Sequence, residues 1–237
     1  MRCASLSALT PAAAAEAAGA ASEKNWRTPL RATVSLTTET ICGLCMMLPR
    51  YSSSSGVKVA LTASMIVHHG SANAKAWLSG LKANLARKPQ GNDRAQVKAI
   101  KEGVCDVAII NHYYMSKMLK DPKQVPWANA VRVIFPNQKD LRPLYHRGAH
   151  MNISGVALTK HAPNREGAIA LMEFLASAEG QGMYAQKNGE YPVTPGIAWN
   201  DLQKSWGPFK QDDLALADIA NNRAAAIRMA DEVGYNK

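Results

Sequence analysis

The alternation of apolar and polar residues predicts a series of helices, and the first two are joined at a glycine. A serine-rich stretch, YSSSSG, precedes an apolar run that ends at Gly70, so one helix is predicted with a serine cap and a glycine stop. The next segment places Trp77, Leu81 and Leu85 at successive i+4 positions, which predicts a second helix with one buried face. Pro89 then ends it.

A helix, a glycine and short apolar runs follow. Asn92 or Asp93 caps the predicted helix RAQVKAIKE, and Gly103 closes it. The runs VCDVAII and VRVIFPNQ have the composition of buried strands. This order is typical of a parallel α/β sheet, whose ligands bind at the carboxyl ends of the strands. The sequence therefore predicts an α/β fold with a ligand site at residues 111–114.

The second half of the chain predicts one more strand, several helices and a loop. HMNISGVALTK has strand composition, whereas residues 165–187 follow the helical spacing and are divided at Gly180. EYPVTPG is an extended loop fixed by its prolines. The end of the chain predicts one amphipathic helix. Its apolar face holds Leu216, Ala220, Ala224 and Ile227.

Length and charge exclude some classes of protein. With 237 residues, of which 47% are hydrophobic, the chain can bury the core of one large domain or of two lobes. Its net charge of +10 allows a nucleic acid, a membrane surface or an anionic ligand as partner. The basic residues alternate with acidic ones along a helical pattern and no nucleic-acid motif is present, so no nucleic acid is expected. No apolar run reaches the ~18 residues of a membrane span.

The first fifty residues follow no clear pattern. Residues 1–20 are rich in small side chains, but Pro11 and Glu16 interrupt them, which makes a poor signal peptide. Cys42 and Cys45 form a close pair without the second pair or histidines that a zinc site needs, and we interpret them as small apolar residues. Residues 1–50 are therefore set apart as an atypical segment.

Two adjacent phenols, Tyr113 and Tyr114, directly follow the predicted strand. Phenolate is a hard anionic oxygen donor that suits a hard trivalent ion, although binding must displace the phenol proton. Tyrosine is also common as a half-buried aromatic residue at strand ends, so the pair alone favours a structural role. Neighbouring side chains of an extended chain point to opposite faces. A turn must therefore redirect one phenol if both are to bind one ion. His112 is a further candidate ligand, and the same requirement applies to it.

Other chemistry finds little support. No G-x-S-x-G, Walker A, H-E-x-x-H or G-x-G-x-x-G motif is present, so an enzyme is not expected. His68 and His69 lie at the end of the predicted first helix, where a cation favours the helix dipole.

Six segments match a known family in order along the chain. They are ASMIVHHG, NLARKPQGNDRAQVKAIKEGVCDVAIINHYY, NAVRVIFPNQ, HMNISGVALTKHAPN, LMEFLASAEGQGMYA and NGEYPVTPG. From about residue 51 to its end, the chain resembles the ferric-iron-binding periplasmic solute-binding proteins of bacterial ABC transporters, including the iron-deficiency-induced type. The resemblance implies a two-lobed, periplasmic-binding-protein-like α/β fold of type II. It also implies a periplasmic monomer that binds Fe(III) with carbonate or a similar anion and delivers it to an ABC permease in the inner membrane.

The resemblance also implies a ligand set. Tyr113 and Tyr114 match the tandem tyrosine ligands of the family, and Asn111 falls where relatives place a polar contact to the anion. The helix start at Asn92 and Asp93 offers backbone N–H groups to the same anion.

Two departures from the family narrow the expectation. A further ligand tyrosine of the relatives falls on Val57, and nothing in residues 1–50 resembles the strands with which the relatives begin. We therefore expect an incomplete N-terminal lobe, with residues 51–135 in the second lobe and residues 136–237 in the C-terminal part of the first lobe. We expect such a site to hold iron weakly unless exogenous anions or a partner complete it. The alternative is a module that binds another solute or oxyanion on the same scaffold.

Overall fold

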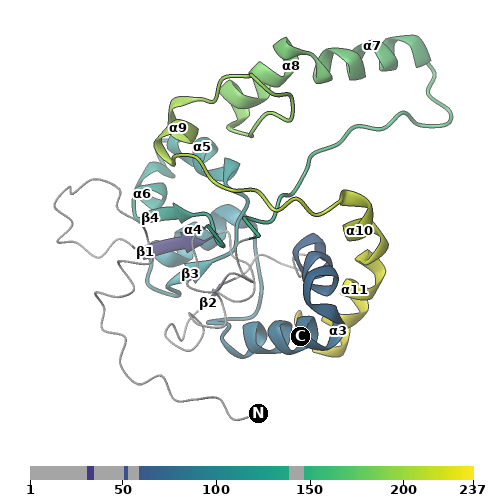
Figure 1. The fold of residues 1–237 in the computed structure, drawn as a ribbon. Helices are drawn as coiled ribbons and strands as arrows, with labels where there is room; N and C mark the ends of the chain where they lie inside the picture. The colour runs from purple at the N-terminus through teal and green to yellow at the C-terminus, as the bar shows by residue number, and fades with distance from the viewer. Residues whose placement is uncertain (1–30, 35–50, 53–58, 139–146) are drawn as a thin grey trace.

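The computed structural model describes residues 31–34, 51–52, 59–138 and 147–237, and Figure 1 shows how their elements are arranged. Two pairs of parallel strands are present: β1 (Arg31–Val34) beside β4 (Val131–Ile134), and β2 (Tyr51–Ser52) beside β3 (Val107–Ala108). The interpretations of Val57, Cys42 and Cys45 lie outside the described residues.

Helices make up most of the remaining regular structure. In chain order they are α3 (Val59–Ala83), α4 (Asp93–Lys101), α5 (Tyr113–Leu119), α6 (Val125–Ala128), α7 (Arg165–Ala176), α8 (Ala178–Met183), the π-helix η2 (Tyr184–Asn188), α9 (Asp201–Ser205), α10 (Leu216–Asn221) and α11 (Arg223–Glu232). Among these described helices, none combines the length and the apolarity that a membrane crossing requires.

The apolar run around β3 divides its side chains between two cores. Val107 and Ile109 join a cluster in which α3 packs against α10 and α11. Ala108 and Ile110 join a second cluster, formed with α4, α5 and α6. Successive side chains of a strand point to opposite faces, so this strand is buried on both sides. A parallel strand between two layers needs such a continuous apolar sequence, and the predicted parallel α/β arrangement is confirmed.

Local signals for helix ends are confirmed at two places. Gly70 has φ 75° and ψ 163°, so the helical geometry of α3 breaks at the predicted stop before it resumes. Asn92 is the cap of α4, and its side-chain oxygen accepts a hydrogen bond from the backbone N–H of Ala95 at 3.1 Å.

Two predictions for residues 150–187 are wrong in part. The segment HMNISGVALTK forms no strand, because no described strand lies beside it to pair with. The helical stretch at 165–187 divides at Ser177, which caps α8, whereas Gly180 lies inside α8. None of the residues of α7 is buried, and of the described elements it packs mainly against α8.

The last predicted helix is two helices, and the face expected to be apolar is not the buried one. α10 and α11 meet at Asn222. The four apolar residues listed for this face, Leu216, Ala220, Ala224 and Ile227, are all exposed. The buried residues of α11 are instead Ala226, Met229 and Ala230. The spacing of apolar residues alone predicted the wrong buried face, because packing against α3 determines which face is buried.

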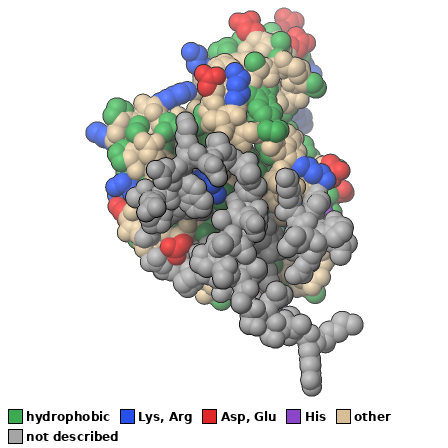
Figure 2. Space-filling model, turned by 60° about the vertical axis from the view of Figure 1, so that its left-hand side comes forward, with side chains coloured by type: hydrophobic (Ala, Val, Ile, Leu, Met, Phe, Trp, Pro, Cys, Tyr) green, Lys and Arg blue, Asp and Glu red, His purple; other side chains and the backbone are tan. Residues whose placement is uncertain are grey.

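Charged side chains are mixed over the described surface. Figure 2 shows Lys and Arg side chains interspersed with Asp and Glu on the face that it draws, and they form no single basic block there. This agrees with the interpretation of the net positive charge as a solvated surface.

Two segments far apart in the sequence cross at the centre of the molecule. Ala149 and Gln211 form a parallel bridge, in which Ala149 N–H donates to the Lys210 oxygen and Asp212 N–H donates to the Ala149 oxygen, both at 2.9 Å. Gly148 has φ 95°, and a Cβ added there would lie 2.5 Å from the backbone carbon of Gln211. Only glycine therefore allows this close approach.

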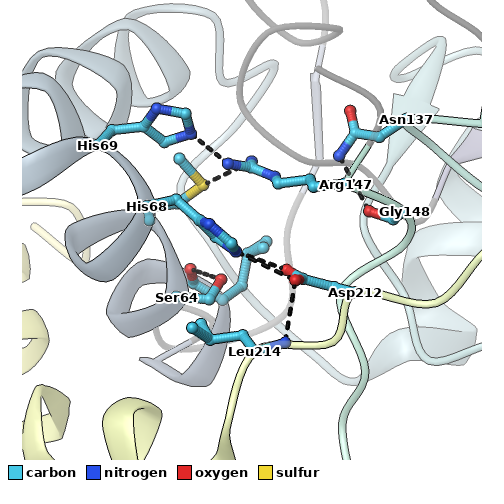
Figure 3. A network of polar contacts seen from close by, with 10 residues as sticks. Ser64, His68, His69, Asn137, Arg147, Gly148, Asp212 and Leu214 are labelled. Atoms are coloured by element: carbon cyan, nitrogen blue, oxygen red, sulfur yellow. Dashed lines mark hydrogen bonds and ion pairs between the residues drawn. The ribbon is translucent and has the colours of Figure 1, made fainter. Parts of the chain in front are cut away.

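Histidines of α3 tie that helix to both crossing segments (Figure 3). His68 Nε2 donates to the two carboxylate oxygens of the buried Asp212 at 2.8 and 3.1 Å. Arg147 donates to Nε2 of His69 and also to the Met65 sulfur at 3.5 Å. The two histidines at the helix end thus have specific partners from distant segments, beyond any interaction with the helix dipole.

Burial keeps two histidines of this region neutral. Burial lowers the pKa of His150 to about 4; the nearby Asp212 opposes this shift, whereas Arg147 and His68 add to it. The pKa of His69 is also lowered to about 4, first by burial and then by Arg147 and His68.

Stability should therefore fall as the pH is lowered from 6.5 towards 4. Both histidines have a folded pKa below the ordinary value of 6.5, so the unfolded chain binds more protons in this window. The free energy of unfolding is expected to be largest above 6.5 and to decrease progressively below it, as measured by urea unfolding across this range. His150→Gln should show a weaker pH dependence, and an unchanged dependence would contradict the assignment to His150.

Candidate metal centre

The chain turns at the end of the buried strand and brings Tyr113 and Tyr114 together. His112 has helical dihedral angles, φ −59° and ψ −34°, and α5 begins at Tyr113. Neighbouring helical residues are rotated by about 100°, so the two phenols no longer point to opposite faces. Their rings stack at a centroid distance of 4.5 Å and an angle of 27°. The turn that two phenols facing one ion require is present.

A buried carboxylate fixes this turn. Asp93, the first residue of α4, is 5% exposed, and its Oδ2 accepts hydrogen bonds from both the backbone N–H and the side-chain Nδ2 of Asn111 at 2.9 Å. The structure thus brings together both residues that were predicted to bind an anion. The Asp93 carboxylate is occupied by its hydrogen bonds from Asn111. Asn111 also faces outward, and its side-chain oxygen accepts a hydrogen bond from Asn152 at 3.3 Å.

A cleft of about 1180 Å³ opens in front of the turn. Asn111, His112 and Tyr113 line it on the side of α5, and Glu190 and Tyr191 line it from the loop after η2. Neither Asp93 nor Tyr114 is among the described residues that line it. Tyr113 therefore faces the cleft directly, and Tyr114 lies behind it, stacked on its ring.

His112 packs among aromatic rings. Its ring lies 4.8 Å from Tyr191, 5.8 Å from Trp206 and 6.2 Å from Tyr113, measured between centroids. Burial lowers its pKa to about 4, although a hydrogen bond with the Gly189 backbone opposes the shift. Within the described residues, its buried Nε2 has no hydrogen-bond partner. His112 is a neutral imidazole with an available lone pair.

The charges around the phenols keep Tyr113 protonated while no cation is bound. Burial raises its pKa above the ordinary value, and the neighbouring Tyr114, Glu190 and Asp93 side chains raise it further. A bound cation would reverse the effect of these charges. Lys117, one turn along α5, lies 5.0 Å above the Tyr113 ring and 5.8 Å above the Tyr114 ring, in cation–π geometry.

The sequence did not indicate Lys117 or Glu190 as neighbours of the phenols. The i+4 spacing from Tyr113 to Lys117 would have shown the first contact, had a helix been predicted to begin at Tyr113. No spacing rule links Glu190 to Tyr113. The described residues hold no group of three or more His, Cys, Asp or Glu side chains that could hold a metal ion.

Known proteins with similar sequences are named for iron uptake or for ferric iron binding. The chain is 42% identical over 186 residues to iron uptake protein A1 of Synechocystis sp., covering 78% of this chain and 50% of that protein. It is 31% identical over 147 residues to the major ferric iron-binding protein of Neisseria meningitidis, covering 62% and 41%. The chain thus spans about half the length of the curated relatives it matches. No family model matches it.

Solved structures with similar folds belong to the same group. Apo ferric ion-binding protein A of Pasteurella haemolytica has a TM-score of 0.74 and 48% identity, over 80% of this chain and 58% of that one. A Trichodesmium protein solved in complex with iron and citrate ligands has a TM-score of 0.74 and 35% identity, over 84% and 63%. These similarities confirm the predicted fold class, the periplasmic-binding-protein-like two-lobed fold of type II.

The Asp93 carboxylate should contribute measurably to stability. Asp93→Asn replaces a charged acceptor of two hydrogen bonds in a buried position, and we expect a loss of about 1.5–3 kcal/mol in the free energy of unfolding. Urea unfolding measures this loss. Asp231→Asn, at the exposed end of α11, is the matched control and should leave stability nearly unchanged. Equal stabilities of the two variants would contradict this role of Asp93.

Proposed function

Because the chain is a homologue of the bacterial ferric-iron-binding solute-binding proteins, we propose that it binds Fe(III) through the phenolate oxygens of Tyr113 and Tyr114. The observation that carries this proposal is the pairing of the two phenols at the start of α5, beside the cleft. Two hard oxygen donors at one place suit a hard trivalent ion. A ferric ion displaces the phenol protons of its tyrosine ligands as it binds.

An anion completes this site in the proposed scheme. Two phenolates leave coordination positions open, and carbonate or a similar oxyanion is the ligand that the resemblance implies. Asn111 lines the cleft with its amide beside the phenols, which supports a contact to such an anion. The Trichodesmium relative was solved with iron and citrate, which supports an oxygen-rich small molecule as the co-ligand. Asp93 acts here by orienting Asn111.

The wider role follows from the relatives. We propose that the protein is a periplasmic solute-binding component that delivers iron to an ABC permease of the inner membrane, and that it acts as a monomer without catalysis. The relatives are named as uptake and binding proteins, which supports a binding role. They are about twice as long as the matched region, so transport itself is part of the proposal.

A second candidate function is the binding of an oxyanion without iron. Two amides, those of Asn111 and Asn152, line the cleft and are hydrogen-bonded to each other, and they are neutral groups suited to an anion. A ligand of the folded state raises the thermal midpoint, so a rise with carbonate or citrate alone, and none with iron, would favour this candidate.

Ferric citrate titration tests the iron site directly. The wild-type protein should develop a visible phenolate-to-iron absorption band that saturates with added iron, and Tyr113→Phe and Tyr114→Phe should each abolish or strongly weaken it. Tyr235→Phe is the matched control, because this tyrosine is 1% exposed in the core beside α3 and α11, and it should keep the full band. Absence of a band in the wild-type protein at saturating iron would overturn the proposal.

A further inference from the structure

The loop that carries Glu190 is held firmly against the helix that carries the phenols. Gly189 has φ 74° and is buried, and a Cβ added there would lie 2.5 Å from the Cβ of Ser116 in α5. The Gly189 backbone is also hydrogen-bonded to His112. The backbone oxygen of Lys187 in η2 accepts a hydrogen bond from Lys120 Nζ at 2.7 Å. These contacts fix the position of Glu190 relative to Tyr113.

Two neutral donors orient the Glu190 carboxylate. Ser154 Oγ donates to Oε2 at 3.2 Å, and Asn188 Nδ2 donates to Oε1 at 3.1 Å. Each oxygen keeps a lone pair, and among the residues that the structure describes no lysine or arginine forms an ion pair with this carboxylate. Metal-binding carboxylates are commonly oriented in this way by neutral hydrogen-bond donors.

The carboxylate and the Tyr113 phenol face one space. Both residues line the cleft, and Gly189, the neighbour of Glu190, packs against Ser116, three residues after Tyr113 in α5. A phenolate and a carboxylate that face one space repel each other when no cation lies between them. A trivalent cation between them replaces this repulsion with attraction, and carboxylate and phenolate are both hard oxygen donors.

We propose that Glu190 is a further oxygen ligand of the ferric ion bound by Tyr113 and Tyr114. The inference rests on the proposed iron-binding function and adds to it a donor that comes from a distant part of the sequence. It gives the site a third negative charge from the described residues, which matches the charge of Fe(III).

The test compares Glu190→Gln with the wild-type protein in ferric citrate titrations, using the phenolate-to-iron band and competition with free citrate. Glu190→Gln should keep the band, because both phenols remain, but bind Fe(III) more than roughly 100-fold more weakly, because the loss of a ligand costs more than the ~10- to 100-fold typical for the loss of a ligand's hydrogen-bonded partner. Glu173→Gln, at an exposed position of α7, is the matched control and should bind like the wild-type protein.

Ser154→Ala distinguishes a ligand from a loop anchor. This variant removes one hydrogen bond to Glu190 but keeps the carboxylate, so it should lower the affinity much less than Glu190→Gln does. Terbium(III) luminescence lifetimes in H₂O and D₂O give the number of water molecules bound to a hard trivalent probe. Glu190→Gln should raise this number, because water replaces a lost ligand, whereas Ser154→Ala should not.

Each outcome decides a separate question. A wild-type band together with unchanged affinity and unchanged water number in Glu190→Gln would overturn the role of Glu190 and leave the tyrosine site standing. Equal losses of affinity in Ser154→Ala and Glu190→Gln would likewise overturn it, in favour of a loop anchor. A wild-type protein without the band would overturn the proposed function, and the Glu190 ligand with it. Circular dichroism spectra of all variants show whether each is folded.

Discussion

The hydrogen bonds from Asn111 to the Asp93 carboxylate link the start of one helix to the end of the buried strand, and the geometry of the candidate site follows from this link. Val107 to Ile110 is buried on both faces and cannot shift without exposing one core or the other. With the backbone N–H of Asn111 paired to a buried carboxylate, the strand cannot continue. The chain instead turns at His112, and α5 begins with the two tyrosines side by side.

The electrostatic character of the site follows from its neighbours. Negative oxygens surround Tyr113, while the nearest histidine, His112, is kept neutral by burial among aromatic rings. Lys117 lies over the ring faces of the two phenols. With the Tyr113 phenol held protonated beside these negative groups, the site gains most from a highly charged cation. The arrangement thus favours a hard metal ion, in agreement with the iron-binding names of the relatives.

Features set by local rules could be predicted from the sequence. The break of α3 at Gly70, the cap of α4 at Asn92 and the buried strand β3 (Val107–Ala108) each depend on a few adjacent residues. Features that depend on distant partners could not. The segment at 150–160 has strand composition without a described neighbour to pair with, and the buried face of α11 is chosen by α3. Spacing identified the phenol pair, but the position of Glu190 beside it arises from tertiary packing through Gly189.

The central claim is that both phenol oxygens at the start of α5 bind the same ferric ion. A crystal structure of the protein soaked with ferric citrate, with anomalous data collected at the iron absorption edge, tests it most directly. The account predicts a single strong iron peak in the cleft, within bonding distance of the hydroxyl oxygens of both Tyr113 and Tyr114. An iron peak remote from these two oxygens, or bonded to neither, would contradict it.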